Sequence, residues 1–244
     1  RNGTTKDSAS ADGSVTNITT QDSIDANSND GDDSNDSYEF DKLATTFDTS
    51  TNIGLSVVAV SHEDVRTIPI GVAIGGAAVN GVISTTLFDS TTEAIVESGV
   101  SVNATNTGAG TDQDVSVVAV GTSNVNSIAT GIAGAASNAV AASLDTTIYK
   151  KVVRARMLGT MATNRDIKIN AQSNDTLLQT VGSVAASGTD ATAGAVGVAV
   201  IGSTVLAEVG DSATAKAGRD LLVNAREISN ITQVAGQAQV GGCV

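Results

Sequence analysis

The residues best suited to chemistry in this chain form an acidic run between positions 25 and 36. Carboxylate and amide oxygens recur there at short spacing, and Ca²⁺ takes about 6 to 8 oxygen ligands of this kind. The run does not follow the EF-hand pattern, because Asp30 stands where that loop requires glycine and Asp36 where it requires a bidentate glutamate. Two interpretations stay open, a calcium site and a solvated acidic loop. The candidate ligands are Asp25, Asn27, Asn29, Asp30, Asp32 and Asp36.

Other reactive side chains are isolated. His62 is the one histidine, so no second imidazole can join it on zinc, and no serine or cysteine nucleophile motif accompanies it. We expect it to be a turn residue on the solvent side. The one cysteine, Cys243, cannot form an internal disulfide; it is either an unpaired thiol or a site of intermolecular pairing or lipid attachment. Aromatic residues that could stack on sugars make up only 2%. The prediction is that the chain is not an enzyme.

Charge and hydropathy exclude further classes. The formal net charge is −13, so no surplus of Lys and Arg is available to neutralise nucleic-acid phosphates. No stretch reaches the roughly 18 apolar residues of a membrane span, which predicts no membrane insertion. Because the sequence begins with Arg1 and not with Met, we expect a precursor that has lost its export signal, and hence an extracellular or cell-surface product.

Two parts of the chain differ in composition. Up to Asp48 there are eleven acidic residues against Arg1, Lys6 and Lys42, a net of −8 that leaves −5 for the remainder. A segment this polar buries too little apolar surface to compensate for the entropy that it loses on becoming ordered, so it seldom orders by itself. The predicted organisation is therefore an extended acidic segment over residues 1–50, ordered as an arm by contacts with a neighbouring subunit, and a strand-rich domain over residues 51–244.

Short phrases repeat along the second part. GVSVNA at 99–104, DIKINA at 166–171 and DLLVNA at 220–225 each alternate apolar and polar residues. A second phrase, LSVVAV at 55–60, returns 60 residues later as VSVVAV at 115–120. Period-two alternation predicts strands with one apolar face. We expect a continuous core in which Val100, Val102, Ile167, Ile169, Leu221 and Val223 point inward, with Lys168 and Asn170 outward.

The apolar residues of this chain are mainly Val, Ile and Ala, which suit thin, closely spaced layers of strands. Together with the repeats, they predict an all-β fold, a parallel β-helix or β-solenoid. One strand, over residues 147–157, carries Lys150, Lys151, Arg154 and Arg156. We interpret it as a basic edge strand whose charges discourage unwanted pairing.

The phrase AVGVAVIGSTVLAEVG at 195–210, followed by AKAGRDLLVNA at 215–225, resembles the repeats of large bacterial exoproteins of the filamentous-haemagglutinin-like and leukotoxin-like kind. The resemblance covers about residues 53–242. It implies a parallel β-helix that serves as a stalk or adhesive fibre.

Two functions are therefore expected from the sequence. The first is a secreted structural subunit that polymerises with copies of itself, because the strand pattern VAGQAQV at 234–240 shows no polar cap. The second is an adhesin stalk fragment that binds host or cell-surface ligands.

Overall fold

The computed structural model describes residues 14–19, 48–105 and 110–242. Every regular element within these ranges is a β-strand, and they contain no helix long and apolar enough to cross a membrane. The all-β prediction is confirmed for this part of the chain.

The strands are β1 (Ser14–Thr19), β2 (Asp48–Thr67), β3 (Ile70–Gly75), β4 (Ala78–Val96), β5 (Ser101–Val102), β6 (Asp114–Ala135), β7 (Asn138–Met157), β8 (Thr160–Thr163), β9 (Ile167–Ser187), β10 (Asp190–Val209), β11 (Thr214–Ala217) and β12 (Leu221–Gly241).

These strands form three sheets that the chain visits in turn. The first sheet has the order β1-β2-β6-β9-β12, with β3 continuing the row of β2 beside β6; the second has the order β10-β7-β4; the third has the order β11-β8-β5. Strands that come from successive passes pair in parallel and in register, as Leu55, Val115, Ile167 and Leu221 do. This arrangement of stacked parallel sheets is compatible with the predicted parallel β-helix.

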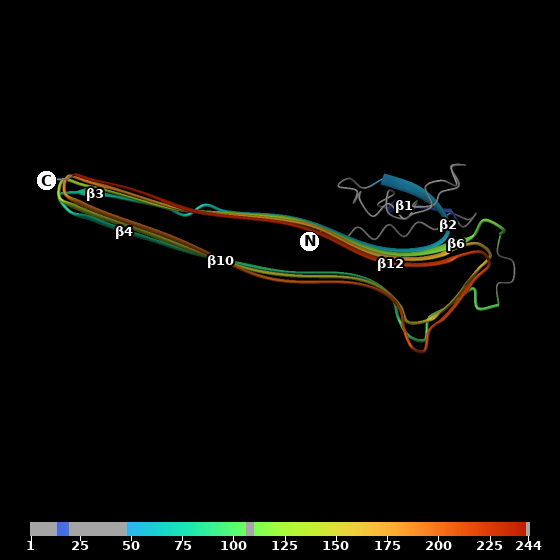
Figure 1. Ribbon diagram of the computed structural model, residues 1–244. Coiled ribbons are helices and arrows are strands. Elements are labelled where there is room, and N and C mark those ends of the chain that lie inside the picture. Colours follow the sequence, from blue (N-terminus) through green and yellow to red (C-terminus); the bar gives the residue numbers. More distant parts are fainter. Residues whose placement is uncertain (1–13, 20–47, 106–109, 243–244) are drawn as a thin grey trace, which may run out of the picture.

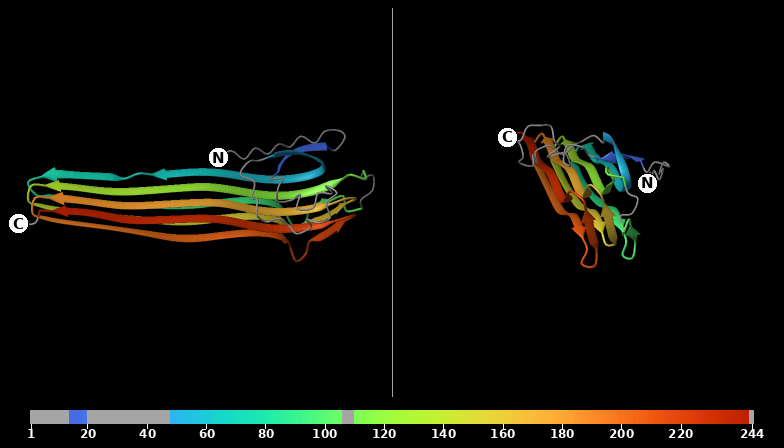
Figure 2. Two further views of the ribbon diagram at one scale, coloured as in Figure 1. Left: turned by 45° about the horizontal axis from the view of Figure 1, so that its top comes forward. Right: turned by 90° about the vertical axis from the view of Figure 1, so that its right-hand side faces the viewer.

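Figure 1 shows that the first and second sheets face each other along the molecule and meet in turns at one end. The short third sheet lies at the opposite end and widens the cross-section there (Figures 1 and 2). We call this wide part the three-sided end. The blade is the remaining two-layered part, which comprises residues 125–135 of β6, residues 138–149 of β7 and their register partners.

The size of the buried side chains follows this change in width. Met157, Met161, Ile167 and Ile169 are fully buried at the three-sided end. Farther along, Phe88 and Tyr149 stack with ring centroids 4.7 Å apart. Near the turns the core consists of alanines alone: Ala78, Ala133, Ala139, Ala141, Ala185 and Ala193. The sheets come so close here that a Cβ added at Gly131 would lie 2.8 Å from the Ser143 hydroxyl oxygen.

The repeat prediction is correct for two of the three copies. Residues 167–171 and 221–225 pair in register, and the 60-residue echo pairs β2 with β6. The copy at 99–104 is correct only in part: Val102 packs against the core as predicted, but Ser101–Val102 belongs to the third sheet and Val100 is 41% exposed. Residues 115–119 occupy its expected position. Alternation marks a strand in any of the three sheets, so it cannot assign the sheet.

The basic strand is also a correction. β7 is the central strand of the second sheet and not an edge. Lys151 points into the core and is buried, whereas Lys150, Arg154 and Arg156 point outward. Arg156 lies 2.5 Å from Glu208 on one neighbouring strand and 3.7 Å from Glu93 on the other. Arg156 therefore bridges the three strands of this sheet.

Candidate functional site

The predicted calcium ligands at positions 25–36 lie outside the residues that the structure describes, so the calcium site stays a prediction. Within the described residues no group of three or more His, Cys, Asp and Glu side chains is placed to hold a metal ion. Of the predicted arm, β1 is described, and it pairs antiparallel with residues 48–53 of the same chain. Its predicted contact with a neighbouring subunit stays a prediction.

His62 lies on the exposed face of β2, so the predicted solvent exposure is correct and the predicted turn is wrong. Its Nδ1 atom is 2.6 Å from Thr122 Oγ1 on the neighbouring strand. The residues around His62 are polar, which suggests a turn. They nevertheless keep the two-residue alternation of a strand, and β2 continues through them.

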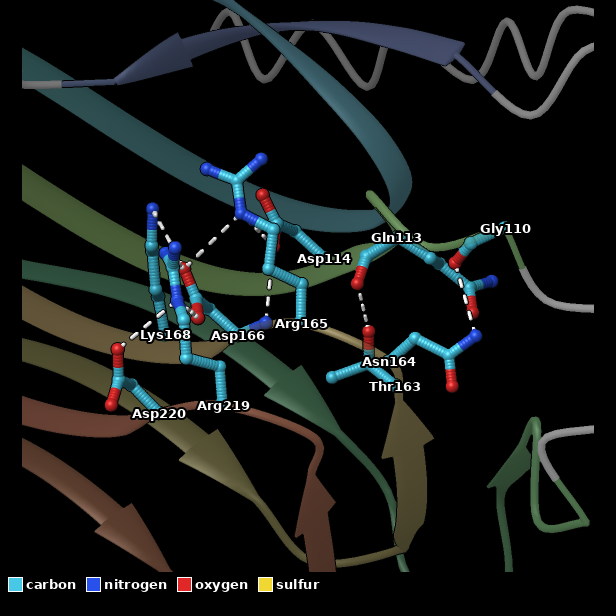
Figure 3. A network of polar contacts seen from close by, with 10 residues as sticks. All are labelled: Gly110, Gln113, Asp114, Thr163, Asn164, Arg165, Asp166, Lys168, Arg219 and Asp220. Carbon is cyan, nitrogen blue, oxygen red and sulfur yellow. Dashed lines mark hydrogen bonds and ion pairs between the residues drawn. The ribbon is translucent and has the colours of Figure 1, made fainter.

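Charged side chains gather where the third sheet returns to the first (Figure 3). Asp166 precedes β9 and is 2% exposed. Arg219 donates to both of its carboxylate oxygens, from Nε at 2.8 Å and from Nη2 at 2.5 Å. The backbone N–H of Asp166 donates to Asp114 Oδ1 at 3.1 Å. We call this group, completed by Arg165, Lys168 and Asp220, the charged corner.

The charge balance of the corner determines the state of Asp166. Burial would raise the pKa of its carboxyl, but the hydrogen bonds and charge of Arg219, with the charges of Lys168 and Arg165, hold that pKa below its ordinary value. The carboxylate is therefore ionised and already paired at neutral pH. Such a group ties successive passes of the chain together.

The adjoining turn supports the same interpretation. The Thr163 hydroxyl donates to the backbone carbonyl of Gln113, and Asn164 Nδ2 donates to the Gly110 carbonyl at 3.1 Å (Figure 3). Both hydrogen bonds join one pass of the chain to the next. Together with the charged corner they fix the end of the sheet stack.

A second polar group lies inside the molecule, between the two long sheets. Lys151 Nζ is 2.7 Å from Asp175 Oδ1, and the two side chains are 0% and 4% exposed. Ser123 and Ser173 donate to the two oxygens of the same carboxylate at 2.7 and 2.8 Å. Tyr149 Oη is 2.5 Å from Ser123 Oγ. We call these five residues the buried polar cluster.

Each member of this cluster has a partner, which a buried ion pair requires. Burial first, and then Asp175, raise the pKa of the Tyr149 hydroxyl above its ordinary value, so the phenol stays protonated. Gly121 makes room for the lysine, since a Cβ there would be 2.7 Å from Lys151 Cε. Sequence reasoning missed this cluster. The sequence does contain an indication of it, because the alternation of β7 places Lys151 on the same side as the buried residues Val153 and Ala155.

Amide side chains form ladders that run toward β12, the last strand of the first sheet. Gln233 Nε2 donates to Gln179 Oε1 at 2.7 Å inside the blade, and Asn224 Nδ2 donates to Asn170 Oδ1 at 3.3 Å on the outer side. Gln179 Nε2 in turn donates to the Asp145 carboxylate at 2.9 Å. Such ladders stabilise stacked parallel strands in register.

The far side of β12 has no strand among the described residues. Its inward positions Leu221, Val223 and Ile231 are 48%, 43% and 50% exposed, whereas their partners Ile167, Ile169 and Leu177 are buried. The apolar rows of the core thus continue to this edge and stop there. Comparison of the chain with protein-family models, with curated proteins and with solved structures finds no match in any of the three. Function is therefore argued from this geometry.

Proposed function

We propose that the chain is a structural subunit of an extracellular or cell-surface filament, a closed parallel β-helix that assembles with copies of itself through its strand edges. The observation that carries the proposal is the edge of β12, where apolar side chains and amide ladders end with no further strand among the described residues. A free edge of this length pairs readily with another strand unless something covers it.

At the opposite edge of the first sheet, β1 pairs only with residues 48–53 of β2, and the part of β2 that follows has no other described strand on that side and carries matching side chains. On β2, Leu55, Val57 and Val65 occupy the register rows that end in Leu221, Val223 and Ile231. A copy stacked with its β2 on β12 would place aliphatic side chains on aliphatic side chains in these rows. This match favours an assembly in which β2 of one copy runs parallel to β12 of the next.

The strand count suggests a role for the predicted arm. The first sheet extends one strand beyond the second, because β12 lies past the level of β10. A head-to-tail junction would therefore leave one second-sheet position open beside β10. The chain of the next copy reaches this position just before its β2, so its residues 1–50 are the segment that would fill the position beside β10. Residues 1–50 outnumber the 20 residues of β10, and those of them outside the pairing of β1 with residues 48–53 are the ones available to fill it.

The composition supports a structural role outside the cell. The net charge of −13 keeps long assemblies apart in solution. Within the charged corner, Arg219 is paired with Asp166, and within the buried polar cluster Lys151 is paired with Asp175. Both groups are placed to hold strands in register.

The test is negative-stain electron microscopy with sedimentation velocity at micromolar concentration. The full chain should form filaments, and deletion of residues 1–50 should abolish them without changing the strand content seen by circular dichroism. Ile231→Lys should also abolish them, because the ammonium would be buried at the junction. Thr232→Lys is the matched control, since Thr232 is exposed on the outer side of the same strand. Normal filaments from the Ile231→Lys variant would contradict the proposal.

A further inference from the structure

The outer face of the second sheet is apolar along the blade. Two rows of side chains across β4, β7 and β10 are entirely aliphatic: Ile83, Leu144 and Val196 form one, and Leu87, Ile148 and Val200 form the other. Ile83 is 77% exposed and Leu87 68%. The outward side chains from Val79 to Leu87 on β4, and those in register on β7 and β10, include no charged residue. Charges return only at Asp89 and Lys150.

A groove runs beside the first of these rows. Gly81, Ala142 and Gly194 stand in register on the three strands, so this row has almost no side chains. A Cβ added at Gly81 or Gly194 would meet no atom within 4 Å. The neighbouring row of Ile83, Leu144 and Val196 forms a ridge. A ridge next to a groove of the same length is complementary to a second copy of itself after a two-fold rotation.

We propose that the blade carries a second self-association surface, on which the outer face of the second sheet packs against the same face of another copy. The ridge of Ile83, Leu144 and Val196 lies in the partner's groove, and the strands of the two copies run antiparallel. This contact is separate from the strand edges of the filament proposal. It would join subunits, or filaments, side by side.

Charge fixes the relative direction of the two copies. The central strand β7 directs Lys150, Arg154 and Arg156 outward. A two-fold axis along the strands would place each of these cations against its own copy, which is unfavourable. In the antiparallel arrangement, the two-fold axis runs across the strands, between the ridge and the groove. The row that contains Asp89 and Lys150 then lies at the turn of the partner's blade, outside the region where the two faces overlap. The rows buried are then those of residues 139–147 of β7, whose outward side chains are uncharged, and Asp190 lies at their rim.

The same blade argues against a lipid partner. Among the described residues no strand pairs with the outer edges of β4 and β10, and each backbone group left without a hydrogen bond costs several kcal/mol in hydrocarbon. Asp190, exposed at the turn of the blade, would have to enter the bilayer first. A second copy leaves both the edges and this carboxylate in water.

The size of the face predicts a weak contact. Three strands spaced about 4.8 Å apart, over nine residues that each rise about 3.3 Å, project an area of roughly 400 Å². A standard stable interface buries about 800 Å² on each partner. Isolated subunits should therefore pair weakly, and copies aligned in a filament should pair more strongly because the contacts repeat.

The test compares two glycine substitutions on β10. Gly194→Val fills the groove, whereas Gly202→Val lies on the same outer face but outside the overlap, and a Cβ at either position meets no atom within 4 Å. Both are made in the Ile231→Lys variant of the full chain, so that edge assembly does not contribute. Sedimentation velocity up to high micromolar concentration should show concentration-dependent dimers. Gly194→Val should weaken them at least tenfold and Gly202→Val should not.

Equal behaviour of the two glycine variants would overturn the proposal, as would a parent that stays monomeric throughout. Flotation with phosphatidylcholine vesicles gives the remaining outcome. A parent that floats with the vesicles, and loses this on Leu87→Lys, would assign the face to lipid and overturn the proposal. None of these results depends on whether the full chain forms filaments through its edges.

Discussion

The three-sided end and the blade use the two faces of the same strands in opposite ways. On β9, Ile167 and Ile169 point inward at the three-sided end and are buried. Toward the turns the inward positions of the same strand become Ser183 and Ala185, while Val184 points outward and is 41% exposed. The alternation itself continues without a break. What changes is which face receives the large side chain.

The width between the sheets explains this difference. The third sheet opens the cross-section at one end, so Met157, Met161 and the isoleucines are needed to fill it. In the blade two sheets face each other directly, and only small side chains fit between them. Large β-branched residues still favour the extended backbone of these strands and therefore point outward. The exposed apolar faces of the blade are a consequence of its thin core.

The largest effect should come from placing a charge in the wide core. Ile169→Asp puts an unpaired carboxylate among buried aliphatic side chains and should lower the free energy of unfolding by at least about 4 kcal/mol. Ile132→Asp, on the outward side of the blade, should lower it by less than about 1 kcal/mol. Urea unfolding of both variants measures the contrast. Equal losses would mean that the outward face of the blade is covered in solution.

The sequence predicts the strands and their parallel stacking, because the 60-residue echo between β2 and β6 carries the register directly. It does not predict the inverted faces of the blade, since alternation gives the period and not the distance to the opposite sheet. It also assigns residues 99–104 to the wrong sheet and β7 to an edge. The position of a strand within a sheet depends on how all passes of the chain stack, which a single strand's sequence does not contain. In the same way, the burial of Lys151 is explained only when the fold places Asp175 opposite it.

The second effect concerns the buried polar cluster, which lies between the two long sheets beside the blade. Lys151→Ala leaves the Asp175 carboxylate buried without its cation, and removal of one partner of such a pair costs about 3 to 5 kcal/mol. The double variant Lys151→Met with Asp175→Leu should lose much less, because no buried charge remains. Lys150→Ala, its outward neighbour, is the control and should change stability by less than about 0.5 kcal/mol. A double variant as unstable as Lys151→Ala would show that the hydroxyl partners, and not the charge, dominate.

A third and smaller effect should follow from widening the blade. Gly131→Val inserts a side chain where the Ser143 hydroxyl oxygen is 2.8 Å from the added Cβ, and overpacking of this kind costs about 1 to 3 kcal/mol. Gly202→Val, which faces outward into open space, should not destabilise the protein. Thermal unfolding by circular dichroism compares the two. A neutral Gly131→Val would indicate that the two sheets separate easily, contrary to the account of the thin core.

The smallest effect belongs to the charged corner, which lies at the three-sided end. The pKa of Asp166 is depressed in the folded protein, so its contribution is present above the ordinary carboxyl pKa of about 3.9 and is lost as the pH falls through the folded value. Because Arg219 is 54% exposed, solvent screens the pair, and Asp166→Asn should cost only about 1 kcal/mol at pH 7.

The pH dependence separates this charge effect from a packing effect at the same position. As the pH falls through the depressed pKa of Asp166, the wild-type carboxyl becomes protonated, so the difference in melting temperature between wild type and Asp166→Asn should shrink toward zero. Asp220→Asn serves as the control, because its side chain is 70% exposed and should change stability little at any pH. A difference for Asp166→Asn that stays constant as the pH is lowered until the protein unfolds would mean that local packing, and not the ionised carboxylate, holds successive passes together at this end. The contrast between an end stabilised by ionised pairs and a blade whose outward face is uncharged from Val79 to Leu87 would then be wrong.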